Sequence, residues 1–235
     1  MRYVIILLVL ASVACSPIYI PNSRSVPLFE QAGEVTIDGA LSTSGVDLNV
    51  GAAVSNNIAV IGNFSYDNNN GDDIENYHKH KFWEVGVGYF KPTESKLKTE
   101  FFGGYGMGEA TSYDSYTFIS LNDSIVSGNF NRVFIQGNIG YKPSDIFVFG
   151  AAIRLSYVTF SDFESTANST RYGNSYSGSF AEPAFFLKLG DPISFNFQVG
   201  FNMPLDNDPA FDYRFFHMSL GIGAKINFAG RKGDD

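Results

Sequence analysis

The stretch that decides the fold is Phe82-Trp83-Glu84-Val85-Gly86-Val87-Gly88-Tyr89. Large apolar side chains stand at every second position from Trp83 to Tyr89, and a carboxylate or a glycine stands between them. Successive side chains of a β-strand point to opposite faces of a sheet, so this alternation predicts a strand with one apolar and one polar face. A helix would instead repeat its apolar residues every three or four positions.

Nine further stretches downstream of residue 33 alternate in the same way, and no helical period of any length interrupts them. The ten predicted strands cover residues 35–41, 46–54, 58–66, 83–89, 100–107, 132–141, 147–157, 182–189, 195–202 and 216–228. Short turns follow the second, fourth, sixth and eighth strands, and longer polar loops follow the third, fifth, seventh and ninth. The turn at 43–45, after the first strand, is the exception, because it is short although it lies on the same side as the longer loops.

Bacterial outer-membrane barrels have an even number of strands, short periplasmic turns and longer outer loops. We therefore expect an all-β fold, an antiparallel up-and-down transmembrane β-barrel of about ten strands over residues 34–228. Both termini would then lie in the periplasm. The alternative is a soluble periplasmic barrel or sandwich, whose apolar face would point inward around an apolar ligand or a packed core.

The polar face of the strands favours the membrane barrel. It carries several glycines, which weaken a solvent-exposed strand but suit a narrow lumen. The apolar face is rich in Phe and Tyr near the strand ends, as an interfacial aromatic girdle requires. Ten strands enclose little free space, and inward charges are costly unless they are paired. We expect a plugged lumen with a paired polar network made of Glu84, Glu100, Arg154, Glu182, Lys188 and Lys225. A narrow pore for small solutes is the alternative.

The composition excludes several other classes of protein. Of the 235 residues 44% are hydrophobic and 16% aromatic, so the chain is not disordered. A single cysteine excludes a disulfide scaffold. The net charge of -8 opposes nucleic-acid binding, because phosphates require a basic face.

The N-terminus predicts export. Residues 1–14 have the pattern of a bacterial lipoprotein signal peptide, with a charged start followed by a short apolar run. Cys15 follows small residues in the manner of a lipobox and would be acylated as the mature N-terminus, although Ser12 replaces the usual leucine. Ordinary cleavage after Ala14 is the alternative.

The segments that flank the barrel are expected to be extended. Residues 15–33 contain three prolines and predict a lipidated tether, with packing against the domain left open for 26–29. Residues 229–235 predict a polar periplasmic tail. The predicted location is the outer membrane, with the lipid of Cys15 in its inner leaflet near the first strand.

Several runs spread over nearly the whole mature chain resemble a group of uncharacterised outer-membrane lipoprotein β-barrels from Bacteroidota. These runs are Tyr19-Ile20-Pro21-Asn22, Val26-Pro27-Leu28-Phe29, Gly33-Glu34, Phe82 to Tyr89, Phe101 to Gly106, Arg132 to Gln136, Glu182-Pro183-Ala184-Phe185 and Asp208 to Tyr213. The resemblance implies an outer-membrane lipoprotein barrel and implies no particular activity. A more distant likeness to small enterobacterial barrels concerns the fold alone, and a fold does not fix a function.

Two histidine patterns are candidates for chemistry. His78 and His80 follow Asp72, Asp73 and Glu75 and could bind a divalent metal. They would share a face only at the start of a strand, and no third spaced ligand is evident, so a solvated loop is the interpretation we favour. We therefore expect neither a metal nor a cofactor.

His217 is the one histidine predicted inside the barrel, near its outer mouth. With Asp212 or Ser219 it could serve a barrel hydrolase or acyltransferase, but no nucleophile motif accompanies it. We therefore expect a protein that is not an enzyme.

We expect a structural or surface-interaction role. The outer loops, at 68–79, 109–129 and 161–176, would be presented to an extracellular or envelope ligand. Five aromatic side chains give them an adhesive composition: Tyr113, Tyr116, Phe118, Tyr172 and Tyr176. The expected partners are outer-membrane lipid and such a ligand, with no nucleic acid.

Overall fold

The computed structural model describes residues 17–69, 77–93, 95–114, 124–165, 170–172, 175–206 and 211–228. The predicted signal peptide, Cys15 and the tail at 229–235 lie outside the described residues. Among the residues that are described, no helix is long and apolar enough to cross a membrane.

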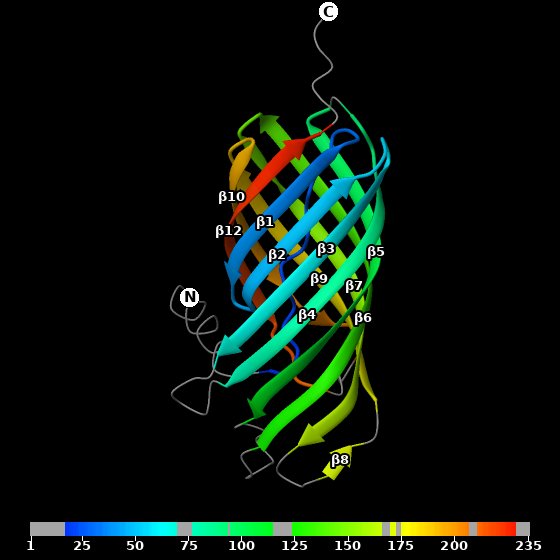
Figure 1. Ribbon diagram of the computed structural model, residues 1–235, viewed down its shortest axis with the longest axis vertical. Helices are drawn as coiled ribbons and strands as arrows, with labels where there is room; N and C mark the ends of the chain where they lie inside the picture. The colour runs from blue at the N-terminus through cyan, green and yellow to red at the C-terminus, as the bar shows by residue number, and fades with distance from the viewer. Residues whose placement is uncertain are drawn as a thin grey trace, which may run out of the picture.

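Ten antiparallel strands close into a barrel, in which each strand pairs with its neighbours in chain order and β1 pairs with β12 (Figure 1). The barrel strands are β1 (Glu34–Ser42), β2 (Gly45–Ala53), β3 (Ile58–Asn69), β4 (His78–Phe90), β5 (Leu97–Asp114), β6 (Ser124–Ser144), β7 (Phe147–Ser165), β9 (Tyr176–Leu189), β10 (Ile193–Phe201) and β12 (Phe216–Asn227). Two short strands, β8 (Thr170–Tyr172) and β11 (Met203–Pro204), pair with β7 and β9. The all-β fold and the strand count are confirmed.

The two ends of the barrel differ. Short connections join β2 to β3, β4 to β5, β6 to β7 and β9 to β10 at one end, which we call the short-turn end. The other connections lie at the opposite, long-loop end. There β5, β6 and β7 are 18, 21 and 19 residues long and run beyond the rest of the barrel (Figure 1). The sequence predicted loops at 109–129 and 161–176, where much of the chain instead continues as paired strand.

The apolar face of every barrel strand points outward. In β4, for example, Trp83, Val85, Val87 and Tyr89 are 42–59% exposed, whereas Glu84 between them is 1% exposed. The same holds around the ring, with exposed Ile37 on β1, Ile135 on β6, Ile153 on β7, Phe195 on β10 and Leu220 on β12. The inward face carries the buried polar side chains, as the alternation predicted.

The N-terminal segment 17–30 runs through the inside of the barrel, and we call it the plug. It enters at the long-loop end, where the Tyr19 amide donates to the Asp212 carbonyl at 3.1 Å and the Arg214 amide donates to the Tyr19 carbonyl at 2.9 Å. It leaves at the short-turn end, where the Gly33 amide donates to the carbonyl of Ala53. Residues 17–29 are all buried.

This path corrects two expectations. The segment at 17–29 is not a tether outside the barrel, because it is buried against the inner wall. For 26–29 this packing is the alternative that the sequence left open. The described chain also begins and ends at opposite ends of the barrel, since Pro17 precedes the contacts at the long-loop end and β12 ends at the short-turn end. The expectation that both termini lie on one side therefore fails for the first described residue.

Apolar contacts hold both ends of the plug. Near the long-loop end the Tyr19 ring lies 5.3 Å from Phe180 and 6.0 Å from Phe130, measured between ring centroids. Near the short-turn end the Phe29 ring lies 5.5 Å from Phe90. Gly140 on the wall leaves room for the plug, because a Cβ atom there would stand 2.5 Å from Cδ1 of Leu28. A glycine on the lumen face thus makes room for the plug, in addition to the side chains of the wall.

Candidate functional site

A buried ionic network lies halfway along the lumen. On the wall, Arg132 Nη2 lies 2.5 Å from Glu84 Oε2, and Arg154 Nη1 lies 3.1 Å from Glu84 Oε1. The register of the sheet explains this convergence, because Glu84, Arg132 and Arg154 all stand on the inward face of their strands. None of the three residues is more than 1% exposed.

Glu182 on β9 is the second acidic centre of this network. Its Oε2 lies 2.6 Å from Arg154 Nη2 and 3.3 Å from Nη2 of Arg24, which belongs to the plug. Its Oε1 accepts hydrogen bonds from Ser156 Oγ at 2.6 Å and from the Tyr19 hydroxyl at 3.1 Å. The plug thus contributes both a cation and a hydroxyl to the carboxylate of the wall.

Asn22 of the plug joins the two acidic centres. Its Oδ1 accepts from Arg132 Nη2 at 2.7 Å and from Arg154 Nη2 at 3.2 Å. Arg132 also donates from Nη1 to the Tyr19 hydroxyl at 3.0 Å. Buried charges are tolerated only when they are paired and hydrogen-bonded, and here each charged group has several partners. The arrangement fixes the position of the plug along the lumen.

Other polar wall residues serve the backbone of the plug. The extended plug forms no sheet, yet its buried amides and carbonyls still need partners. The Arg24 amide donates to Gln198 Oε1 at 2.7 Å, and the Ser23 amide donates to Asp47 Oδ2 at 3.0 Å. The Phe29 amide donates to Glu100 Oε1 at 2.7 Å. The inward polar face therefore binds a peptide segment, and that segment belongs to the same chain.

The six residues predicted for the polar network divide into three places. Glu84, Arg154 and Glu182 meet in the central network. Glu100 lies closer to the short-turn end and binds the Phe29 amide and Nδ2 of Asn138. Lys188 and Lys225 lie at the short-turn end itself, beside Asp38 and Glu34.

Sequence reasoning missed the plug residues of the network and Arg132. Arg132 carried a usable signal, because it stands on the same inward face as Gln136 and Asn138. Tyr19, Asn22 and Arg24 showed no such pattern, because the plug is not a strand of the sheet and contacts several strands in no regular order.

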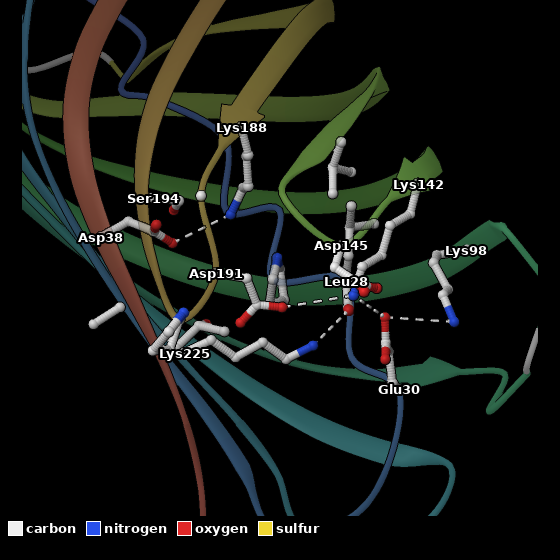
Figure 2. A pocket seen from close by; sticks show the side chains of 16 residues that line it. Leu28, Glu30, Asp38, Lys98, Lys142, Asp145, Lys188, Asp191, Ser194 and Lys225 are labelled. Atoms are coloured by element: carbon white, nitrogen blue, oxygen red, sulfur yellow. Dashed lines mark hydrogen bonds and ion pairs between the residues drawn. The ribbon is translucent and has the colours of Figure 1, made fainter.

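A small cavity at the short-turn end, of about 70 Å³, is surrounded by lysines and carboxylates (Figure 2). Glu30 at the end of the plug lies 3.5 Å from Lys98 Nζ and 3.3 Å from Lys142 Nζ, measured to its Oε1. Lys225 Nζ contacts the Leu28 carbonyl at 3.5 Å (Figure 2). The cavity has room for only a few water molecules. Because these lysines are paired with carboxylates or plug carbonyls, the cluster fastens the plug and leaves little free positive charge for an outside anion.

Acid is expected to loosen this end of the plug. Burial opposes ionisation of Glu30, but Lys225, Lys142 and Lys98 outweigh it and hold the pKa of this carboxyl below its ordinary value. A lowered folded-state pKa contributes stability above the unfolded-state pKa, and that stability is lost as pH falls through the folded-state pKa. We expect urea unfolding to show a fall in stability below about pH 4.5. In Glu30→Gln this fall should be smaller, and an equal fall in both proteins would contradict the assignment.

His217 is fully buried near the long-loop end. Its Nε2 lies 3.7 Å from Asp47 Oδ2 and 3.4 Å from Ser44 Oγ. In a hydrolase triad the carboxylate binds Nδ1 while Nε2 faces the hydroxyl, so this arrangement differs from that geometry. Of the predicted partners, Ser219 is buried and Asp212 is exposed at the rim.

His78 is the first residue of β4 and His80 is two residues further along, so both side chains lie on the lumen face. Asp72, Asp73 and Glu75, which were considered with them, lie outside the described residues. A different carboxylate, that of Asp67 on β3, lies beside the pair. Asp67 carried no signal in the sequence because its proximity depends on the pairing of β3 with β4.

No protein-family model and no curated protein matches this chain. Among solved structures, the translocator domain of the autotransporter NalP from Neisseria meningitidis is similar to it with a TM-score of 0.46 and 12% sequence identity. The similarity covers 83% of this chain and 86% of that one.

Proposed function

We propose that this chain is a closed β-barrel that spans the outer membrane of a Gram-negative bacterium and has a structural or surface-interaction role. The observation that carries the proposal is the distribution of apolar and polar side chains, which is the reverse of that in a soluble barrel. Its exterior is a continuous ring of apolar side chains, and its interior holds buried charges and a segment of its own chain.

The apolar exterior supports lipid as its environment. Phe101, Val133, Phe185 and Ile222, from four different strands, are each 54–63% exposed. A soluble protein rarely exposes a contiguous apolar patch beyond a few hundred Å², whereas a membrane barrel requires an apolar band. A soluble barrel that bound an apolar ligand would need an apolar interior, and here the centre of the lumen is ionic.

The filled lumen argues against a narrow pore. The plug occupies the lumen from Pro17 at one end to Glu30 at the other, and its backbone is bonded to the wall along the way. Solutes would have to displace it. The loops and long strands at the long-loop end are therefore the part of the molecule that is available to a partner. Tyr116 and Phe118, two of the aromatic residues expected there, lie outside the described residues.

The path of the plug changes the expected topology of the lipid anchor. Outer-membrane barrels place short turns in the periplasm and long loops outside. Pro17, the first described residue, then lies on the outer side, and Cys15 precedes it by only two residues in the sequence. We therefore place an acylated Cys15 at the cell surface, whereas the sequence suggested the periplasmic leaflet.

Thiol labelling of intact cells tests this topology. In a Cys15→Ala chain exported by a conventional signal peptide, Ser16→Cys is expected to react with a membrane-impermeant maleimide. The matched Ser55→Cys, in the turn between β2 and β3, is expected to react only after lysis. The reverse pattern would contradict the orientation, and protection of both thiols until lysis would contradict the threading of the plug.

A further inference from the structure

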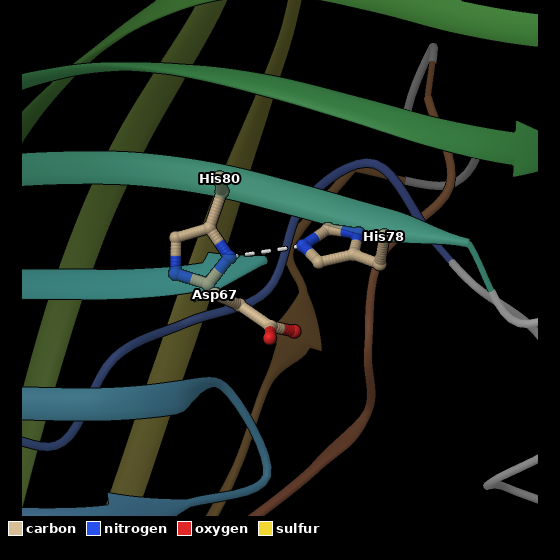
Figure 3. A group of neighbouring side chains, drawn as sticks. All are labelled: Asp67, His78 and His80. Atoms are coloured by element: carbon tan, nitrogen blue, oxygen red, sulfur yellow. Dashed lines mark hydrogen bonds between the residues drawn. The ribbon is translucent and has the colours of Figure 1, made fainter. Parts of the chain in front are cut away.

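Asp67, His78 and His80 form a compact cluster at the long-loop end of the lumen (Figure 3). One ligand atom from each side chain lies within 4.8 Å of the other two. The two histidines are two residues apart on one face of β4, and Asp67 pairs with His80 across the β3–β4 ladder. The cluster therefore belongs to paired strands and does not depend on a loop.

The two imidazole rings are arranged as a chelating pair. His78 Nε2 lies 2.9 Å from His80 Nδ1, and the residues are only 3% and 5% exposed. Only one of two ring nitrogens at this distance can carry the hydrogen between them, so the other is unprotonated and has a lone pair that a metal ion could take in place of that hydrogen. Figure 3 shows the carboxylate of Asp67 beside both rings.

A further contact orients His80. Its Nε2 lies 2.9 Å from Ser65 Oγ, so a hydrogen on Nε2 leaves Nδ1 unprotonated on the side of His78 and Asp67. Metal-binding histidines commonly donate their second ring nitrogen to an oxygen in this way, which fixes the tautomer and the ring orientation.

We propose that Asp67, His78 and His80 bind a Zn²⁺ ion at the long-loop end of the barrel. Two imidazole nitrogens and one carboxylate oxygen are a ligand set that suits zinc, whereas Mg²⁺ and Ca²⁺ prefer oxygen alone. Zinc–ligand distances of about 2.0–2.2 Å are within reach of small side-chain rotations from the observed spacing. The ion would clip β3 to β4 and leave a coordination position for water or an external ligand.

Arg214 is expected to weaken zinc binding. Its guanidinium interacts electrostatically with the Asp67 carboxylate and would compete with zinc for it. Removing this charge is therefore expected to tighten zinc binding, whereas removing a ligand weakens it. These opposite directions separate a metal site from a general effect of disturbing this end of the barrel.

The test is calorimetric titration of the chelator-treated, folded full chain in detergent with Zn²⁺ alone. We expect one equivalent to bind and to raise the unfolding temperature. Asp67→Asn, His78→Gln and His80→Gln are each expected to weaken binding about tenfold or more, Ser65→Ala about tenfold, and Arg214→Gln to strengthen it. The matched control is His217→Gln, which changes the only other histidine and should leave zinc affinity unchanged.

An unboiled electrophoretic shift establishes that each variant is folded. Asp67→Asn keeps the test decisive if a buried histidine variant fails to fold, because Asp67 is only partly buried. Absence of zinc binding by the folded wild-type chain would show that the histidines form an ordinary hydrogen-bonded pair. Binding that is unchanged in folded Asp67→Asn, or lost equally in His217→Gln, would also overturn the proposal.

Discussion

Replacing Glu182 with alanine is expected to lower the free energy of unfolding by about 3–5 kcal/mol, the cost of leaving a buried charge without its partner. The carboxylate of Glu182 contacts Arg154 and Arg24, both fully buried, and accepts from Tyr19 and Ser156. Its removal leaves Arg24 without its carboxylate partner, leaves Arg154 with Glu84 alone, and removes two of the contacts between the plug and the wall. Urea unfolding of the barrel in detergent measures the effect.

Two further variants show whether the loss of stability is specific to Glu182 or would follow the removal of any glutamate. Glu109→Ala removes an exposed carboxylate on β5 and should change stability by no more than about 0.5 kcal/mol. Combining Glu182→Ala with Arg24→Gln should cost less than the sum of the two single changes, because one of the stranded charges is gone. An additive result, or a Glu182→Ala barrel as stable as the wild type, would show that the network does not hold the plug.

Removing the plug is expected to convert a silent barrel into a conducting one. The wild-type chain should carry no steady current across a planar bilayer, since residues 17–29 are buried within the lumen. A chain that lacks these residues should give discrete channel currents. The deletion exposes Glu84, Arg132 and Arg154 to water, and their charges would line the opened path.

A matched truncation and a milder variant make the conductance result interpretable. Deletion of 229–235 also shortens the chain but leaves the plug intact, so it should stay silent. If the chain without the plug does not fold, Leu28→Gly combined with Phe29→Gly loosens its short-turn end and should produce brief openings. Steady current through the wild-type barrel would contradict a closed lumen, as would silence of a folded barrel that lacks the plug.

The alternation of the sequence was sufficient to predict the barrel. Trp83, Val85 and Val87 repeat at the period of a strand, and a strand that faces lipid and a filled lumen has two distinct sides. The glycines between them correctly indicated the inner face. A Cβ atom on Gly104, for example, would stand 2.6 Å from the Phe134 ring, which fills the lumen beside it. Such local patterns need no knowledge of distant residues.

The plug could not be predicted in the same way. From Tyr19 to Phe29 the plug bonds to several strands in no regular order, so no regular spacing marks the segment as interior. Its prolines suggested a tether, although they equally suit an extended chain whose backbone is bonded by wall side chains. Pairings such as Arg24 with Glu182 join residues far apart in the sequence, and a single sequence does not reveal them.

The candidate metal site illustrates the same limit. The spacing of His78 and His80 was visible, but the carboxylate beside them belongs to Asp67 on the neighbouring strand. The residues that were considered instead, Asp72, Asp73 and Glu75, are closer in sequence. Register decides which carboxylate reaches the pair, and register follows from the closed barrel as a whole.

Whether the apolar exterior lies in lipid is tested most directly with a Cys15→Ala chain exported by a conventional signal peptide. This chain has no acyl anchor, so only the barrel can retain it in the membrane. We expect it to remain in the pellet after carbonate extraction and to migrate differently on SDS gels with and without boiling. Release of the Cys15→Ala chain as a soluble protein, while the unchanged chain stays in the pellet, would contradict a membrane-spanning barrel.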